Sequence, residues 1–144
     1  MAGVPTRLST IGYEGRTPEE FLDVLRKAGV TLVCDVRRNP ISRKRGFSKG
    51  SLGRALGEAG LRYEHLPELG IAAARRKNLT PAAKKALFDE YERVDLPKLA
   101  QPLARIAAWA KEGEKVALLC FERDPADCHR SRVAAALGAK TEPL

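Results

Sequence analysis

The feature that most constrains the fold is a pair of short, almost wholly apolar runs that lie far apart in the chain. Residues 30–36 read Val-Thr-Leu-Val-Cys-Asp-Val, and residues 115–121 read Lys-Val-Ala-Leu-Leu-Cys-Phe. Runs of this length and β-branched content are typical of strands that are covered on both faces. Both runs are therefore predicted to be central strands of a parallel sheet.

Segments with helical periodicity alternate with these strands and with two further strand candidates, residues 8–12 and 61–66. The clearest helix starts at Thr17, where Thr-Pro-Glu-Glu supplies an N-cap, a proline in the first turn and a capping-box glutamate. It is expected to end at Gly29. Further helical patterns are found over residues 52–59, 80–91, 96–110 and 133–137.

This alternation predicts a single α/β domain over residues 1–144. The expected fold is Rossmann-like, with a mainly parallel sheet of about four strands and helices on both faces. The run 61–66 is less apolar than the two central strands, so an edge strand running antiparallel is the alternative for that segment.

Charge is the first indication of function. The chain has 26 Lys and Arg against 18 Asp and Glu, which gives a net charge of +8. Such an excess favours anionic partners, including nucleic acid. No apolar run is long enough to cross a membrane, so a cytoplasmic protein is expected, with its three cysteines kept as thiols. The sequence does not indicate an oligomeric state.

Polar residues gather directly after the predicted strands. In an open parallel sheet the ligand crevice lies beyond the carboxyl ends of the strands, so these residues are expected to share one site. The candidates for catalysis are Glu14, Asp35, Glu122, Cys128 and His129. The candidates for substrate binding are Tyr13, Arg16, Arg37, Ser42, His65, Glu68 and Arg130. A structural network of ion pairs would place the same residue types there.

Cys128 has two competing interpretations. Asp124-Pro125 predicts a helix start, with Asp127 as an acid of the first turn, and a thiol near that end would be stabilised as thiolate and become a nucleophile. The plainer alternative is a small buried residue, because free cysteines are usually inert. Cys34 and Cys120 lie within apolar runs and are expected in the core. Metal binding is the third interpretation: Cys120, Cys128 and His129 do not match the paired short spacings of zinc sites, although His65 and Glu122 could complete a site in space. No metal site is predicted.

A basic loop follows the strand at 30–36. Between Arg37 and Gly50 the chain has six positive residues and no acid. The candidates for contact with a nucleic-acid backbone are Arg43, Lys44, Arg45 and Lys49, with Phe47 as a possible stacking ring. No glycine pattern matches a phosphate-binding loop or a dinucleotide fingerprint, so no cofactor is expected.

Four motifs, in order along the chain, resemble the domain of unknown function 488 family. They are residues 10–16 (Thr-Ile-Gly-Tyr-Glu-Gly-Arg), Asp35-Val36-Arg37 with Pro40 and Ser42, residues 65–70 (His-Leu-Pro-Glu-Leu-Gly), and residues 119–122 (Leu-Cys-Phe-Glu) with Cys128-His129-Arg130. The resemblance implies a compact α/β domain with this motif set and no particular reaction. Two functions remain open: an enzyme acting on a phosphorylated or nucleic-acid substrate, and a non-catalytic nucleic-acid-binding or regulatory module.

Overall fold

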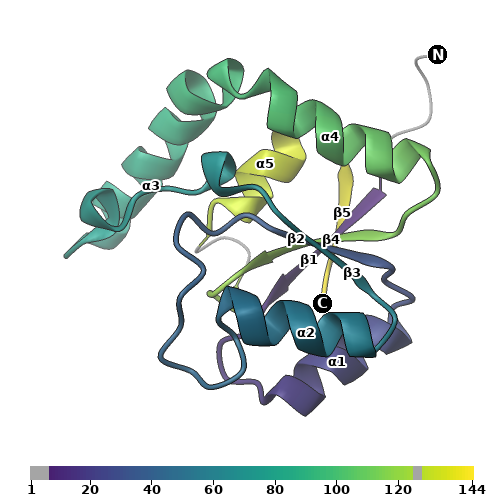
Figure 1. The fold of residues 1–144 in the computed structure, drawn as a ribbon. Helices are drawn as coiled ribbons and strands as arrows, with labels where there is room; N and C mark the ends of the chain where they lie inside the picture. The colour runs from purple at the N-terminus through teal and green to yellow at the C-terminus, as the bar shows by residue number, and fades with distance from the viewer. Residues whose placement is uncertain (1–6, 125–127) are drawn as a thin grey trace.

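A five-stranded parallel sheet forms the centre of the molecule (Figure 1). The computed structural model describes residues 7–124 and 128–144. The strands are β1 (Arg7–Gly12), β2 (Leu32–Asp35), β3 (Arg62–His65), β4 (Val116–Cys120) and β5 (Lys140–Pro143). They lie in the order β3-β2-β4-β1-β5, and every neighbouring pair is parallel. The predicted α/β class with a parallel sheet is confirmed, and the antiparallel alternative for residues 61–66 is wrong.

Helices cover both faces of the sheet (Figure 1). On one face lie α1 (Pro18–Lys27) and α2 (Lys49–Glu58). On the other lie α3 (Pro81–Glu90), α4 (Ala100–Lys111) and α5 (Arg130–Ala136). Between α3 and α4 the chain forms a π-helical turn, η3 (Tyr91–Asp95), and a 3-10 turn, η4 (Leu96–Lys98). Two more 3-10 turns, η1 (Pro67–Leu69) and η2 (Ala73–Arg76), follow β3.

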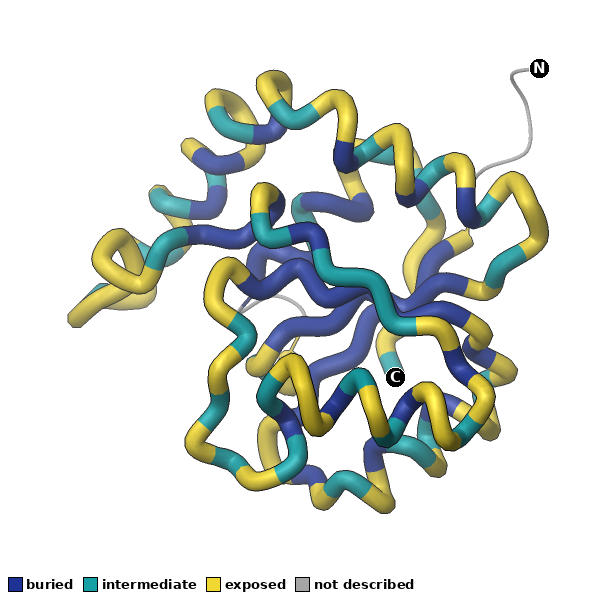
Figure 2. Tube along the Cα trace, viewed as in Figure 1, coloured by how far each residue is buried: buried dark blue, intermediate teal, exposed yellow. Residues whose placement is uncertain are grey.

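Alternating strand residues divide the apolar interior into two cores, one on each face of the sheet. Val33 and Leu119 face the core that Phe21 of α1 and Leu56 of α2 complete. The strand residues between these point to the other face, where they pack with the helices on that side. This second core includes Leu32, Cys34, Leu118, Phe88, Ile106 and Val133. Strands β1, β2 and β4 are dark blue along nearly their whole length in Figure 2, and β2 and β4 are buried at every position. This double cover explains why these two strands were the plainest in the sequence.

The local signals at the first helix are confirmed. Thr17 Oγ1 accepts a hydrogen bond from the Glu20 N–H, and Glu20 Oε1 accepts one from the Thr17 N–H, each at 3.1 Å. The chain then turns at Gly29, whose φ of 73° is in the left-handed region that glycine adopts at little cost. α1 therefore begins and ends where its sequence predicts.

One strand was missed, and one helix start was misplaced. β5 is short, exposed at each residue and contains Pro143, so it has none of the apolar pattern by which strands are recognised. It joins the sheet only through backbone pairing with β1. The helix expected from Asp124-Pro125 begins instead at Arg130, so Cys128 precedes that helix. Pro125 and Asp127, on which that prediction drew, lie outside the described residues.

Gly12 sets how closely the carboxyl end of β1 approaches the segment after β4. A Cβ at this position would lie 1.8 Å from the carbonyl oxygen of Glu122. We expect Gly12→Ala to lower the free energy of unfolding by about 1–3 kcal/mol, as overpacking usually does. Gly57→Ala is the control: its Cβ would meet no atom within 4 Å, and it should stabilise α2 by about 0.5–1 kcal/mol. Chemical denaturation measures both values, and equal effects would contradict the close approach.

Candidate functional site at the carboxyl edge of the sheet

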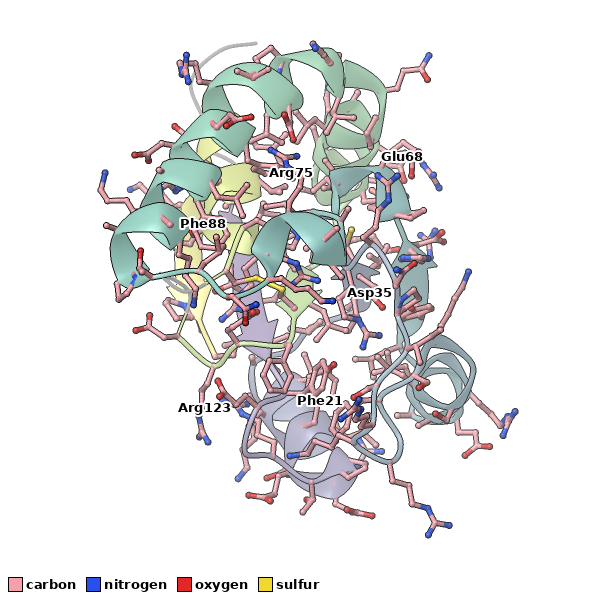
Figure 3. All side chains as sticks on the ribbon, turned by 90° about the vertical axis from the view of Figure 1, so that its left-hand side faces the viewer. Phe21, Asp35, Glu68, Arg75, Phe88 and Arg123 are labelled. Carbon is pink, nitrogen blue, oxygen red and sulfur yellow. A yellow bond between two sulfur atoms is a disulfide. The ribbon has the colours of Figure 1, made fainter. Side chains whose placement is uncertain are left out.

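The strand register brings the predicted site residues to one edge of the sheet. Gly12 at the end of β1 pairs with Cys120 at the end of β4, and Asp35 at the end of β2 lies opposite both Leu119 and His65. The three loops that follow β1, β2 and β4 therefore start side by side. Figure 3 shows the side of the molecule where these loops meet. Asp35 is labelled toward the right of this view and Arg123 toward the left.

A buried ion pair between Asp35 and Arg37 lies at this edge. Asp35 Oδ1 accepts from the Arg37 backbone N–H at 3.1 Å and from Nε at 2.8 Å, and Oδ2 accepts from Nη2 at 2.7 Å. Oδ2 also accepts from the Tyr63 hydroxyl at 2.6 Å. The Asp35 side chain is wholly buried, and that of Arg37 is 7% exposed. Every acceptor position of the carboxylate is thus engaged within the protein, which gives Asp35 a structural role.

Arg37 also holds the basic loop against the sheet. Its Nη1 donates to the Phe47 carbonyl oxygen at 2.7 Å and to the Tyr13 hydroxyl at 3.2 Å. The Tyr13 and Phe47 rings are stacked, with centroids 4.5 Å apart, and Phe47 is fully buried. Phe47 is therefore a core residue, and the interpretation of this ring as a platform for a base is wrong.

Electrostatics at this pair follow from its geometry. Burial by itself lowers the pKa of Arg37, but the hydrogen bonds and charge of Asp35 outweigh it and raise the pKa above the ordinary arginine value. Burial, together with the negative charge of Asp35, raises the pKa of the Tyr63 hydroxyl. Arg37 stays a cation and Tyr63 a neutral donor. Tyr63 was not among the predicted site residues, although its place opposite Val33 in the neighbouring strand puts it beside this carboxylate.

Residues around the turn after β3 and within the basic loop are also held by backbone contacts. His65 Nε2 lies 2.8 Å from the Arg37 carbonyl oxygen, to which it donates. Ser42 Oγ accepts from the Lys44 N–H at 3.1 Å, and the Ser42 N–H donates to Ser48 Oγ at 2.9 Å. Glu68 is exposed on η1. Substrate binding by Tyr13, Ser42, His65 and Glu68 stays a prediction.

Cys120 and Cys128 are joined in a disulfide, shown as the yellow bond in Figure 3. The expectation that all three cysteines are thiols is thus wrong for this pair, because the segment after β4 returns Cys128 to the end of the strand. Both residues are buried. Cys34 is a free thiol in the core, as predicted, and burial raises its pKa. A role for Cys128 as nucleophile stays a prediction and requires the reduced form.

His129 lies against the two sulfur atoms. Its Nε2 is 2.8 Å from the Val36 carbonyl oxygen, and its Nδ1 is 3.6 Å from Cys128 Sγ and 3.9 Å from Cys120 Sγ. A carbonyl oxygen can only accept, so Nε2 carries the proton and the neutral ring turns its Nδ1 lone pair toward the sulfurs. Burial lowers the pKa of His129 to about 4, with the charges of Arg76 and Arg130 adding to the effect. The imidazole is therefore neutral near pH 7.

Three arginines gather at the loops after β1 and β4. Arg130 is 1% exposed and donates to the carbonyl oxygens of Glu122 and Arg123, at 2.6 and 3.1 Å. Arg16 is 6% exposed and donates to the Leu144 main-chain oxygen at 2.9 Å. Burial is the main cause that lowers the pKa of each, and the positive charge of Arg123 acts further on Arg16. Arg123 directly follows Glu122 and lies among the polar residues expected after the fourth strand, but it was given no role among the predicted site residues.

These arginines leave donors unused. Within the part of the chain that the structure describes, Arg16 Nε and Nη1 and Arg130 Nε are buried and have no hydrogen-bond partner. The nearby carboxylates are engaged elsewhere or lie beyond ion-pair distance: Glu14 Oε1 accepts from the Arg123 backbone N–H at 3.0 Å, and Glu122 Oε2 lies 3.3 Å from Cys120 Sγ. The predicted residues Glu14, Arg16, Glu122 and Arg130 are thus brought together.

A surface cavity lies elsewhere. Its volume is about 150 Å³, and residues from the amino ends of β1 and β5 line it together with Lys115. It faces away from the loops described above, so it does not contribute to this site. The candidate nucleic-acid contacts Arg43, Arg45 and Lys49 are exposed, and Lys44 is half-buried over the Phe47 ring. No helix among residues 7–124 and 128–144 is long and apolar enough to cross a membrane.

Comparison with protein families assigns residues 17–137 to "Domain of unknown function DUF488". The chain belongs to the DUF488 family. The family resemblance is thereby confirmed, and the matched range includes three of the four motifs and begins after residues 10–16. No curated protein matches the chain. Among solved structures it is similar to a "Putative phosphatase (DUF442)" of Shewanella putrefaciens CN-32, at 15% identity and a TM-score of 0.46. That match covers 95% of this chain and 65% of the other.

The structural role of the Asp35–Arg37 pair in this DUF488 domain can be tested by removing one partner. Asp35→Ala would leave the buried guanidinium uncompensated, and we expect a loss of about 3–5 kcal/mol in the free energy of unfolding. Asp23→Ala is the matched control, because Asp23 pairs with Lys27 on the exposed surface of α1. An exposed pair contributes less than about 1 kcal/mol. Urea denaturation distinguishes the two, and a loss below about 1 kcal/mol for Asp35→Ala would contradict this role.

Proposed function

We propose that the carboxyl edge of the sheet binds a phosphate group of a phosphorylated or nucleic-acid substrate, and that Arg16 and Arg130 receive it. The observation that carries the proposal is the set of three buried guanidinium nitrogens without a partner among the described residues. Each such donor costs about 1–3 kcal/mol when it is left unpaired. Phosphate oxygens match the guanidinium fork in charge and geometry, so a bound phosphate would offset this deficit.

The surroundings of the two arginines favour binding of an anion from solution over pairing with a carboxylate of the protein itself. Neither Arg16 nor Arg130 forms an ion pair with a carboxylate side chain among the described residues, and Arg123 adds a third positive charge beside Arg16. The net charge of +8 would attract an anionic ligand from solution. Because the unpaired nitrogens are shielded from solvent, binding requires the residues that cover them to shift.

Catalysis at this site would depend on the two glutamates that lie next to the arginines. Glu122 is half-buried, and Glu14 is exposed at the start of the loop after β1. Either carboxylate has an oxygen available for proton transfer, whereas Asp35 has none. The Glu122 carbonyl oxygen itself accepts a hydrogen bond from Arg130, so Glu122 lies beside the arginines. It is therefore the proposed general acid or base.

The anion site can be tested with inorganic phosphate as the probe. We expect Arg130→Gln and Arg16→Gln each to weaken phosphate binding by at least about tenfold, since a hydrogen bond to a charged group contributes about 1.5–3 kcal/mol. Arg54→Gln, which removes an exposed charge from α2, should leave the affinity unchanged. Chemical-shift titration measures the affinities, and thermal unfolding checks that each variant is folded. Equal affinity in the wild type and all three variants would refute the proposal.

Turnover separates an enzyme from a binding module at the same site. The wild-type chain is incubated with a chromogenic phosphate monoester and a diester, and Glu122→Gln is compared with it. An enzyme loses turnover in Glu122→Gln while phosphate affinity is kept, because the arginines are intact. A chain that binds phosphate but turns over neither ester fits the alternative, a non-catalytic module.

A second candidate function, nucleic-acid binding without sequence preference, rests on the basic loop. Arg43, Arg45 and Lys49 are exposed and form no ion pair with a described residue. The loop is fixed to the sheet by Arg37, so these charges are presented from one place. Exposed and unpaired cations of this kind bind phosphates of the backbone rather than base edges.

Replacing Arg43, Lys44 and Arg45 together by Ala should weaken binding to duplex DNA. The slope of log affinity against log salt should become shallower by about 0.9 for each phosphate that the protein no longer neutralises. A control triple variant, with Arg54, Lys98 and Lys111 replaced by Ala, removes the same formal charge from exposed positions on or near α2 and α4. Fluorescence anisotropy at several salt concentrations measures both. If the two triple variants behave alike, only net charge matters and the loop is not a binding surface.

A further inference from the structure

Cys120, Cys128 and His129 bring three metal-binding atoms to the end of β4. The two sulfurs and His129 Nδ1 all lie within 4.8 Å of one another, and all three residues are buried. The disulfide is one state of this cluster. When the pair is reduced, two thiol groups and an imidazole nitrogen share the same small volume.

The hydrogen bond from His129 Nε2 to the Val36 carbonyl orients the ring as metal-binding histidines are oriented. Such histidines almost always donate their other N–H to a carboxylate, a backbone carbonyl or water, which fixes the tautomer. Here the 2.8 Å bond directs the Nδ1 lone pair toward the sulfurs. Tyr91 packs edge-on against the ring, with centroids 5.5 Å apart, and further restricts its rotation.

The distances agree with a tetrahedral zinc site. Zn–S bonds of about 2.3 Å and Zn–N bonds of about 2.0 Å, at tetrahedral angles, place sulfur and nitrogen about 3.5 Å apart. His129 Nδ1 lies 3.6 Å from Cys128 Sγ and 3.9 Å from Cys120 Sγ. Only the two sulfurs have to separate, to about 3.8 Å by the same geometry, and cleavage of the disulfide permits this.

Two thiolates and a neutral imidazole are common zinc ligands, and a water molecule takes the fourth position in sites with three protein ligands. Glu122 Oε2 lies 3.3 Å from Cys120 Sγ, but the ligand atoms within 4.8 Å of one another are the two sulfurs and His129 Nδ1, without the Glu122 carboxylate.

We propose that the reduced chain binds one zinc ion through Cys120, Cys128 and His129, with water as the fourth ligand, and that the disulfide form does not. Each zinc ion taken up displaces the two thiol protons, and no change of oxidation state is involved. The two thiolates balance the charge of the zinc ion. This inference is independent of phosphate binding. The sequence ranked metal binding third at these residues because seven residues separate the two cysteines, unlike the short spacings of familiar zinc motifs.

The wild-type chain tests the proposal without any substitution. Zinc is added to the protein reduced with a phosphine and, separately, to the disulfide form, each in competition with a chromogenic chelator. Native mass spectrometry should show one zinc ion, with two protons displaced, on the reduced chain only. Cobalt in place of zinc should give the charge-transfer band of thiolate ligands. Equal zinc uptake by both forms, or no uptake by the reduced form, would overturn the proposal.

Variants then identify the ligands. We expect Cys128→Ser and His129→Gln each to reduce zinc affinity by at least about tenfold, since even the loss of a residue behind the ligands costs about 10–100-fold. Cys34→Ala removes the remaining thiol, which lies in the core away from the cluster, and should bind as the wild type does. Circular dichroism of each zinc-free variant confirms folding. Transfer of zinc binding to a Cys34-dependent site would also refute the assignment.

Discussion

The buried ion pair of Asp35 and Arg37 is the contact on which the carboxyl edge depends. Asp35 ends a strand that is covered on both faces, so its carboxylate can remain ionised only if the protein itself replaces water. Arg37 supplies that replacement, and Tyr63 from the neighbouring strand completes it. A pair that is buried this deeply is costly to break, because either partner alone would be an uncompensated charge.

The same arginine links the strand to the basic loop and thereby shapes the surface beside the site. Its contact with the Phe47 carbonyl holds that loop back against the sheet, and stacking of Phe47 on Tyr13 adds an apolar contact from the loop after β1. The loops that follow two different strands are thus fixed relative to each other. Arg43 and Arg45 remain exposed on a loop whose base is rigid.

A second group of residues, on the β1 and β4 side of the edge, is less completely satisfied. Arg16 and Arg130 keep buried N–H groups without a partner among the described residues, while Glu122 contacts a sulfur with which it shares no proton in the disulfide. A folded protein usually pairs its buried polar atoms, and these unpaired donors are the basis of the proposed phosphate site. The fully paired Asp35 network and the incompletely paired arginines thus differ at one sheet edge.

The sequence by itself determined the elements that carry a local signal. The apolar runs of β2 and β4, the capping box at Thr17 and the turn at Gly29 all act within a few residues, and each is where it was predicted. Parallel pairing then follows from the alternation of strands and helices, which was enough to gather the polar residues at one edge. β5 carried no such signal, because a short polar edge strand is defined by its neighbour rather than by its own side chains.

What only the tertiary structure decided is the partner of each polar side chain. Asp35 and Glu122 are both acids at the end of apolar strands and cannot be told apart in the sequence. Every acceptor position of Asp35 is nevertheless occupied by Arg37 and Tyr63, whereas Glu122 lies beside a disulfide. Phe47 stands among arginines but is buried, because Tyr13 reaches it from another loop. Cys128 meets Cys120 and His129 only after the chain has turned back at the end of β4. Periodicity and capping report the environment along the chain, whereas hydrogen bonds, burial and metal geometry depend on residues that are distant in sequence and adjacent in space.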